Sequence, residues 1–241
     1  MVKQAAPELA ATTNEQRNAA LAAVRTALLQ HQEEIFEANR QDMEQAEADG
    51  VSGPVRKRLK FDEGKLRDVM AGISDLTGME DPLFQTQFAR ELDEGLVLKR
   101  VTCPIGVIGV IFEARPDALV QISALCIKSG NCAILKGGSE ALRTNKTLFD
   151  IIHRAVINAG LPAECMMQLE ARSEINELLE CHDSVDLLIP RGSNAFVQYI
   201  MNHTKIPVMG HADGICHIYV DKEADLAKAV PIIVDAKTQY V

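Results

Sequence analysis

Three things that the sequence has little of narrow what this protein can be. No apolar run approaches the roughly 18 to 20 residues needed to span a bilayer. The first residues, MVKQAAPELAATTNEQ, contain no basic segment followed by an apolar one. Positive charge is scarce, because 25 Lys and Arg stand against 34 Asp and Glu, and the resulting net charge of -9 repels a phosphate backbone. We therefore expect no membrane segment, no nucleic-acid partner and a cytoplasmic location.

Patterns that mark metal, redox or common catalytic sites are also missing. The six cysteines have no CxxC spacing and stand mostly in apolar segments, so we interpret them as reduced, buried and small hydrophobic residues. His211, Asp213 and His217 come close together in GHADGICH, but a zinc site needs more donors at closer spacing, and we expect no metal. The sequence has no GxSxG nucleophile elbow, GxGxxG fingerprint or Walker A loop.

What the sequence does contain is a helical first third, followed by alternating strands and helices. Apolar residues at helical spacing, such as Leu21, Val24 and Leu28, predict helices over residues 5–48 and 55–76. Further on, the short apolar strings VIGVIFE, CAILKG, MMQLE, DLLIPRG and CHIYVD alternate with helical segments at 118–128, 141–159, 174–181, 195–202 and 224–237. This alternation predicts an α/β fold with a doubly wound parallel sheet, which binds ligands at the carboxyl ends of its strands. We expect a helical segment over residues 1–80 and an α/β domain over residues 81–241.

The first of three polar junctions between a strand and a helix is FEARPDAL. It places Glu113, Arg115 and Asp117 around a proline. The planar guanidinium of Arg115 suits a phosphate or a carboxylate. The alternative is that Arg115 closes the turn through a salt bridge to Glu113 or Asp117.

The second junction is ILKGGSEALRTN. Gly137 and Gly138 would let the backbone approach a ligand, Ser139 is a good N-cap residue, and Lys136 adds a positive charge at the end of the strand. Such a junction suits a sugar or phosphate of a nucleotide. An ordinary turn with a lysine at the end of its strand is the alternative.

The third junction, LIPRGSNAF, starts a helix at Gly192 and Ser193 directly after a strand. Free backbone N–H groups and the positive end of the helix dipole would favour a pyrophosphate there. Three helix starts that favour anions on one sheet together predict a dinucleotide site.

With these junctions placed, the sequence resembles a known family. The segments that carry the resemblance are CPIGVIGVIFEARPDALVQISALCIKSGNCAILKGGSEALRTN, LLIPRGS, CHIYVD and DAKTQ. They are similar to the gamma-glutamyl phosphate reductase (glutamate-5-semialdehyde dehydrogenase) family of the aldehyde dehydrogenase superfamily, and the resemblance covers essentially the whole chain. It implies an aldehyde dehydrogenase-like fold with a Rossmann-like sheet. It also implies NADPH-dependent reduction of L-glutamate 5-phosphate to the semialdehyde with phosphate release, the second step of proline biosynthesis. In that chemistry a cysteine thiolate attacks the acyl phosphate, and hydride from the nicotinamide reduces the thioester.

The resemblance also assigns a cofactor site. Lys136 matches a lysine that contacts the adenosine ribose, and Gly192 with Ser193 matches a Gly-Ser pair at the pyrophosphate. Ser139 stands where NAD-preferring members often have a glutamate, whose charge would repel a 2'-phosphate, so the resemblance implies NADP(H). The residues expected to bind the cofactor are Glu113, Lys136, Gly138, Ser139, Gly192 and Ser193.

Arg115 falls near the position of the asparagine that holds the oxyanion in ordinary aldehyde dehydrogenases. A cation there suits a substrate that carries an acyl phosphate, so Arg115 is expected to bind the substrate.

The family's nucleophilic cysteine follows AKTQ by a few residues. We therefore expect it beyond Val241, together with most of the catalytic domain, and we expect no catalytic residue within the chain. Cys216 is interpreted as a core residue of a strand. The complete protein is expected to be a homo-oligomer, and the chain alone to associate through exposed apolar patches. The alternatives are a non-catalytic NADP(H)-binding module and a decayed fragment without a stable fold.

Overall fold

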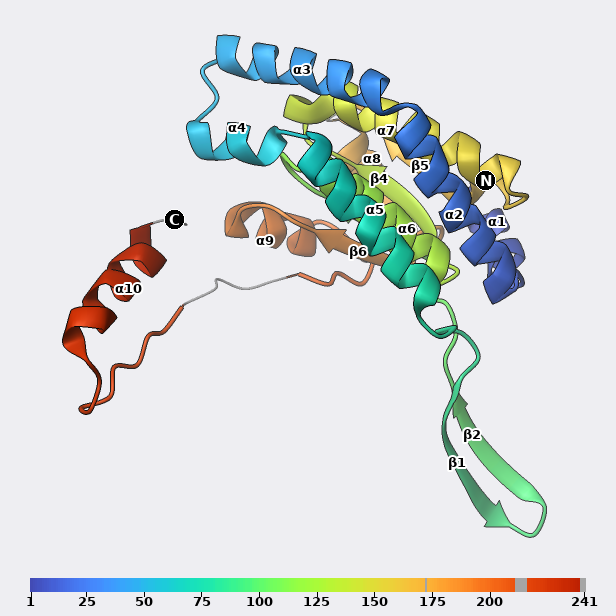
Figure 1. Cartoon of the computed structure of the whole chain (residues 1–241). Helices are drawn as coiled ribbons and strands as arrows, with labels where there is room; N and C mark the ends of the chain where they lie inside the picture. The colour runs from blue at the N-terminus through green and yellow to red at the C-terminus, as the bar shows by residue number, and fades with distance from the viewer. Residues whose placement is uncertain (172, 211–215, 239–241) are drawn as a thin grey trace. The chain divides into compact units, whose positions relative to one another are not determined.

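The computed structural model describes residues 1–171, 173–210 and 216–238 (Figure 1). Its contacts divide the chain into two compact units, Met1–Gly210 and His211–Val241. The change from helices to strands expected near residue 80 falls inside the first unit, between α5 and β1.

The first unit begins with five helices: α1 (Val2–Ala10), α2 (Asn14–Gln30), α3 (Gln32–Ala48), α4 (Gly53–Leu59) and α5 (Glu63–Gly78). Local sequence explains where they start. Thr13 and Gln16 form a reciprocal capping box at the start of α2, and the Asp62 carboxylate accepts a hydrogen bond from the Lys65 backbone N–H at the start of α5. The apolar residues at helical spacing are buried as predicted, among them Leu21, Val24 and Leu28 of α2 and Leu66, Val69 and Ile73 of α5.

A parallel four-stranded sheet follows, with strand order β5-β4-β3-β6. Its strands are β3 (Val107–Ile111), β4 (Cys132–Lys136), β5 (Met166–Leu169) and β6 (Leu187–Pro190). They are connected by α6 (Pro116–Lys128), η1 (Ser139–Ala141), α7 (Leu142–Asn158), η2 (Ala163–Cys165) and α8 (Glu174–Glu180), and α9 (Asn194–Asn202) comes after β6. Strands β3 and β4 are buried along their whole length, as expected of a sheet covered by helices. The predicted α/β class is confirmed.

Three layers pack on one another in this unit. Helices α6 and α7 contact the sheet, and α2, α3 and α5 pack on α6 and α7 (Figure 1). Strand β3 lies between β4 and β6, so the chain leaves β3 toward one side of the sheet and later returns to its other side. Ligands bind at such a switch point, outside the carboxyl ends of the strands.

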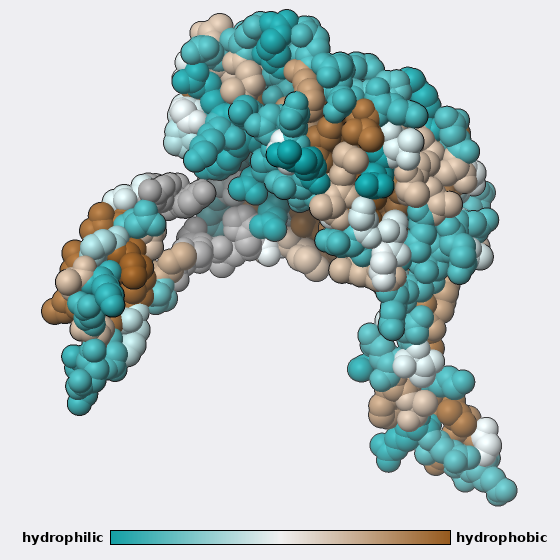
Figure 2. Space-filling model, in the orientation of Figure 1, coloured by the Kyte–Doolittle hydropathy of each residue, from teal (hydrophilic) through white to brown (hydrophobic). Residues whose placement is uncertain are grey.

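A hairpin of β1 (Thr86–Asp93) and β2 (Leu96–Val101) was not predicted as a separate element. The apolar stretch that begins at residue 96 contributes to two separate strands, β2 and β3. Every residue of the hairpin is exposed, including Phe88, Leu92 and Leu98. Apolar and hydrophilic side chains lie mixed along it (Figure 2). A two-stranded hairpin is marginally stable by itself in water.

The second unit contains α10 (Leu226–Thr238), with the Asp225 carboxylate accepting a hydrogen bond from the Ala227 backbone N–H at its start. The prediction of a strand at CHIYVD is wrong, because residues 216–220 have no regular structure. A strand needs the backbone groups of a neighbour, and residues 216–238 of the second unit contain no strand that could supply them. Cys216 is accordingly exposed rather than part of a core.

No helix among the described residues is both long and apolar enough to cross a membrane.

Candidate functional site

A cavity of about 380 Å³ lies at the carboxyl ends of the parallel strands. It is lined from all four strand ends: Phe112 and Glu113 after β3, Lys136 to Glu140 after β4, Glu170 after β5, and Ser193 and Phe196 after β6. The three junctions that the sequence analysis selected therefore meet at one place. Five of the residues expected to bind a cofactor, namely Glu113, Lys136, Gly138, Ser139 and Ser193, line this cavity.

Lys136 ends β4 with its side chain inside the protein. The residue is 5% exposed, and its Nζ donates a hydrogen bond to the Gly137 carbonyl oxygen at 2.6 Å. The backbone carbonyl of Lys136 accepts from the Phe112 N–H at 3.0 Å, which fixes the end of β4 against β3. A buried ammonium at the edge of a cavity that contains both apolar and polar surface suits a nucleotide sugar or phosphate.

The two glycines after Lys136 are needed for packing within the protein. A Cβ atom on Gly137 would lie 2.2 Å from Nδ2 of Asn145, and one on Gly138 would lie 2.2 Å from Oε1 of Glu140. The space beside both glycines is thus filled by side chains of the same chain. Their role in letting a ligand approach stays a prediction.

Ser139 was expected to be an N-cap residue, and this expectation is wrong. The start of α7 is capped instead by a side chain of α3, in the outer layer of helices. Ser139 begins the short η1 helix and makes no capping hydrogen bond. The buried Asp42 of α3 instead accepts hydrogen bonds from the backbone N–H groups of Arg143, at 3.3 Å, and Thr144, at 2.8 Å. It also accepts from the Thr144 hydroxyl at 2.7 Å and pairs with the Arg143 guanidinium at 3.4 Å. Arg143 therefore pairs with Asp42 and is not among the residues that line the cavity.

Glu113, Gly192 and Ser193 lie where β3 and β6 end. A Cβ atom on Gly192 would lie 2.9 Å from Oε1 of Glu113, so the glycine leaves room for that carboxylate. Ser193 is the N-cap residue of α9, and its hydroxyl accepts a hydrogen bond from the Phe196 backbone N–H at 3.3 Å. The N–H of Arg191 donates to the Ile111 carbonyl at 2.7 Å, which keeps the two strand ends together.

Arg115 is exposed at the N-cap position of α6 and does not line the cavity. The alternative of a salt bridge to Glu113 or Asp117 is not observed, because Asp117 pairs with Lys65 of α5 at 2.9 Å. Within the described residues the Arg115 guanidinium has no hydrogen-bond or ion-pair partner, so it is available to a ligand; the Arg115 carbonyl accepts from the Ala118 N–H at 3.0 Å.

Glu140 was missed by sequence reasoning, although it directly follows Ser139. Its Oε1 accepts a hydrogen bond of 2.5 Å from the backbone N–H of Ala114. Glu170, also missed, pairs with Lys146 at 2.5 Å. Carboxylates on one wall of the cavity are therefore partly neutralised or hydrogen-bonded by the protein itself.

The interpretation of the cysteines holds for only half of them. Cys126, Cys132 and Cys165 are buried, and burial raises the pKa of their thiols to about 12, about 11 and about 12. The other three, Cys103, Cys181 and Cys216, are exposed. None of the six lines the cavity.

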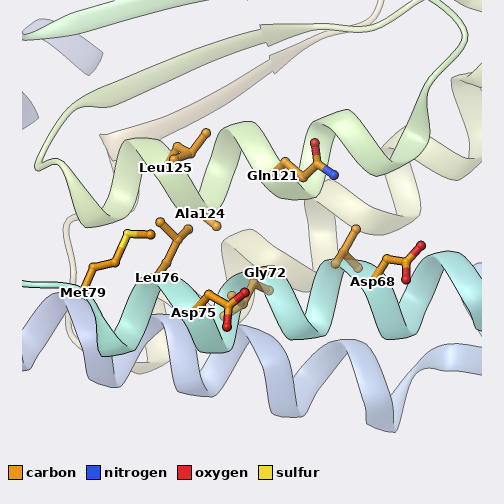
Figure 3. A pocket seen from close by; sticks show the side chains of 10 residues that line it. Asp68, Gly72, Asp75, Leu76, Met79, Gln121, Ala124 and Leu125 are labelled. Atoms are coloured by element: carbon orange, nitrogen blue, oxygen red, sulfur yellow. The ribbon is translucent and has the colours of Figure 1, made fainter.

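A second cavity, of about 320 Å³, lies between α5 and α6 and contains no residue predicted to function (Figure 3). Leu76 extends from α5 toward Ala124 of α6, and the lining is mainly apolar, with Asp68 and Asp75 also contributing to it. The described residues contain no group of three or more His, Cys, Asp or Glu side chains that could hold a metal ion. His211 and Asp213 lie outside the described residues.

The parallel sheet, the glycine-rich strand ends and the cavity between them form the arrangement in which α/β proteins of this class bind ligands. The aldehyde dehydrogenase family model matches residues 2–240, and the chain belongs to this family. Members of the family bind nicotinamide cofactors.

Individual relatives have a more specific name. The chain is 56% identical over 240 residues to a gamma-glutamyl phosphate reductase of Pelotomaculum thermopropionicum, and the match covers 100% of this chain and 55% of the relative. It is 53% identical to the enzyme of the same name from Acetivibrio thermocellus, covering 100% of this chain and 56% of that one. The chain thus spans about half the length of the curated relatives it matches.

A solved structure of a protein with the same name has the same fold. The gamma-glutamyl phosphate reductase of Thermotoga maritima is 34% identical and superposes with a TM-score of 0.90, covering 99% of this chain and 58% of that chain. The predicted aldehyde dehydrogenase-like fold is confirmed.

Proposed function

We propose that this chain forms the NADP(H)-binding part of an enzyme that reduces L-glutamate 5-phosphate to L-glutamate 5-semialdehyde and releases phosphate, in proline biosynthesis in the cytoplasm. The observation that carries the proposal is the cavity at the four strand ends, which brings Glu113, Lys136 and Ser193 together in a chain 56% identical to a reductase of that name.

The residues present fit a nicotinamide dinucleotide. The cavity lies at the switch point of a parallel sheet, where the fold class binds dinucleotides. Lys136 supplies a buried cation, and the start of α9 at Ser193 supplies backbone N–H groups for a pyrophosphate. The bound cofactor would supply the hydride, while Lys136, Gly192 and Ser193 would hold its adenosine and pyrophosphate groups.

The preference for NADP(H) over NAD(H) is carried by Ser139. This residue is exposed, uncharged and on the cavity wall, so it does not repel a 2'-phosphate as a carboxylate would. Arg143 does not contribute a free cation, because Asp42 holds it. The preference therefore depends on Lys136 and on the absence of a charge at position 139.

Arg115 is proposed to bind the substrate through its acyl phosphate. It is exposed, it follows β3 by a few residues, and its guanidinium has no partner among the described residues. A planar fork of donors recognises phosphate oxygens in a bidentate way.

Fluorescence titration of the chain with NADPH and NADH tests the cofactor assignment. We expect saturable NADPH binding that is tighter than NADH binding. Lys136→Met should weaken NADPH binding at least about tenfold, which corresponds to about 1.4 kcal/mol. Ser139→Glu should weaken NADPH binding by about tenfold while sparing NADH, because a new negative charge faces the 2'-phosphate.

The matched control is Lys57→Met, since Lys57 of α4 is exposed and remote from the cavity lining. Its NADPH affinity should equal that of the wild type. NADH binding as tight as NADPH binding would refute the preference for NADP(H). Absence of saturable binding of either nucleotide would refute the assignment as a whole.

No cysteine of the chain is proposed as the nucleophile. Three thiols are buried with raised pKa values, and no cysteine lines the cavity. This observation also favours the second candidate, a module that binds NADP(H) without chemistry. Phosphate-dependent formation of NADPH from NADP⁺ and glutamate 5-semialdehyde, measured on the native protein isolated from its source cells, separates the two. Turnover by the native protein would support the reductase, and NADP(H) binding without turnover would favour the module.

The complete protein is proposed to be a homo-oligomer, and the hairpin of β1 and β2 supports this. Its side chains are exposed and partly apolar, and such a hairpin gains stability when it packs on another surface. Light scattering should show association of the chain as its concentration rises. Trypsin should cut at Arg90 or Lys99 of the hairpin in dilute solution, and association should protect these sites. A monomer at every concentration would count against the proposal.

A further inference from the structure

We propose that Glu140 is a positioning residue, whose carboxylate holds the β3–α6 turn and thereby sets the place of Arg115. The proposal rests on the proposed function, because the role of Arg115 toward the substrate comes from it. It connects the wall of the nucleotide cavity to the arginine that would hold the substrate's phosphate.

The connection is a single hydrogen bond between two loops. Glu140 lies in η1, directly after β4, and Ala114 lies in the turn after β3. The Glu140 Oε1 accepts a hydrogen bond of 2.5 Å from the Ala114 N–H. Ala114 immediately precedes Arg115, so whatever fixes its backbone also fixes the direction in which Arg115 leaves the turn.

The Ala114 backbone needs such a contact. Its φ angle is 40°, in the left-handed region that residues other than glycine, asparagine and aspartate rarely adopt. The residue is 6% exposed, so water cannot easily replace a missing acceptor for its N–H. Without the carboxylate, the turn would lose this hydrogen bond, which is the interaction that offsets its backbone strain.

Gly138 leaves the room that this carboxylate occupies. A Cβ atom on Gly138 would lie 2.2 Å from Oε1 and 2.5 Å from both Cδ and Oε2 of Glu140. The Gly138 backbone itself, with φ -66° and ψ 153°, is one that alanine adopts without strain. The three atoms nearest to a Cβ at this position all belong to the Glu140 side chain, which is therefore the group that alanine would displace.

The other carboxylates of the cavity wall do not make this contact. Glu170 pairs with Lys146, and Glu113 lies beside Gly192. Glu140 is thus the carboxylate of the cavity wall whose hydrogen bond connects the loop after β4 to the turn with Arg115.

The test follows the Ala114 amide and the Arg115 Nε–H by nuclear magnetic resonance in the 241-residue chain, during a titration with inorganic phosphate as the probe. Glu140→Ala removes the acceptor, and Glu140→Gln keeps a carbonyl oxygen in its place. Gly138→Ala displaces the carboxylate without removing it, which provides a second route if Glu140→Ala folds poorly.

We expect Glu140→Ala to shift the Ala114 amide resonance and to raise the phosphate Kd at Arg115 at least about fivefold, because small misplacements of a binding group are costly. Glu140→Gln should stay within about twofold of the wild type, since it keeps the acceptor. Gly138→Ala should reproduce the loss, and it should have no further effect in the Glu140→Ala background, because the two changes act on one contact.

Phosphate binding at Arg115 that is equal in the wild type and Glu140→Ala would overturn the positioning role and leave the proposed function intact. Equal losses in Glu140→Gln and Glu140→Ala would also overturn it, because charge rather than the acceptor would then matter. An Arg115 signal in the wild type that does not respond to phosphate would instead remove the proposed substrate role of Arg115 itself.

Discussion

Replacing Asp42 by alanine should destabilise the protein strongly, although Asp42 lies about a hundred positions before the helix that it caps. Its side chain is 3% exposed, and its two oxygens accept hydrogen bonds from the Arg143 N–H and from the N–H and hydroxyl of Thr144. A carboxylate at a helix N-terminus also interacts favourably with the helix dipole.

The magnitude follows from two losses. Removing an N-cap side chain costs about 0.5 to 2 kcal/mol. Thr144 is fully buried, so its N–H is left without an acceptor, and an unsatisfied buried donor costs about 1 to 3 kcal/mol. The two overlap, so we expect Asp42→Ala to lower the free energy of unfolding by about 2 to 4 kcal/mol. Asp42→Asn keeps one oxygen acceptor and should lose about half as much.

Urea unfolding followed by far-ultraviolet circular dichroism measures this change, with the slope of the transition expected to stay constant. The matched control is Asp75→Ala on α5, because Asp75 is exposed and its side chain makes no hydrogen bond or ion pair with any residue that the structure describes. It should change the stability by less than about 0.5 kcal/mol. An Asp42→Ala variant as stable as Asp75→Ala would refute the argument that Asp42 caps α7.

Three further predictions test other parts of the structure. In an Ellman titration of the native chain at pH 8, the three exposed cysteines should react fast and the three buried ones slowly, since burial raises the pKa of Cys126 to about 12. Because this folded pKa lies above the unfolded one, the stability that the buried thiols contribute should be lost as the pH rises above about 9. Burial tends to raise the pKa of Asp186, but hydrogen bonds from Lys3 and from the Val107 backbone outweigh it and lower the pKa. The Lys3–Asp186 pair therefore stabilises the fold above the unfolded pKa near 4, and this stability is lost as the pH falls. Lys3→Met should shift the midpoint of acid unfolding to higher pH. Gly106→Ala should lower the melting temperature markedly, because φ is +123° and the new Cβ would lie 2.2 Å from an Asp186 carboxylate oxygen; an unchanged melting temperature would contradict the strain.

Local sequence predicted the parts of the fold that depend on local physics. Alternating apolar strings found β3, β4, β5 and β6 to within a few residues, because buried parallel strands are short and apolar throughout. The site could be approximated for the same reason. Once the strands were known to be parallel, the residues after them had to meet at one edge, and Lys136, Ser139 and Ser193 do line one cavity.

What could not be predicted are partners that come from far away in the chain. Ser139 has the chemistry of an N-cap residue, yet Asp42 caps α7 because α3 packs against it. Gly138 looked like a place for a ligand, but the Glu140 carboxylate lies beside it. The string CHIYVD has the composition of a strand, but composition cannot supply a neighbouring strand.

The packing of α2 and α3 on α7 has a consequence for how the protein is made. Asp42 and Arg143 are 101 positions apart, so at about 5 to 20 residues synthesised per second the helix that needs a cap leaves the ribosome roughly 5 to 20 s after its capping residue. Throughout that interval the first helices expose apolar faces that α6 and α7 will later cover. The nascent chain therefore exposes the kind of apolar helix surface that chaperones bind, and the cavity at the strand ends cannot form before α7 and β6 have both been synthesised.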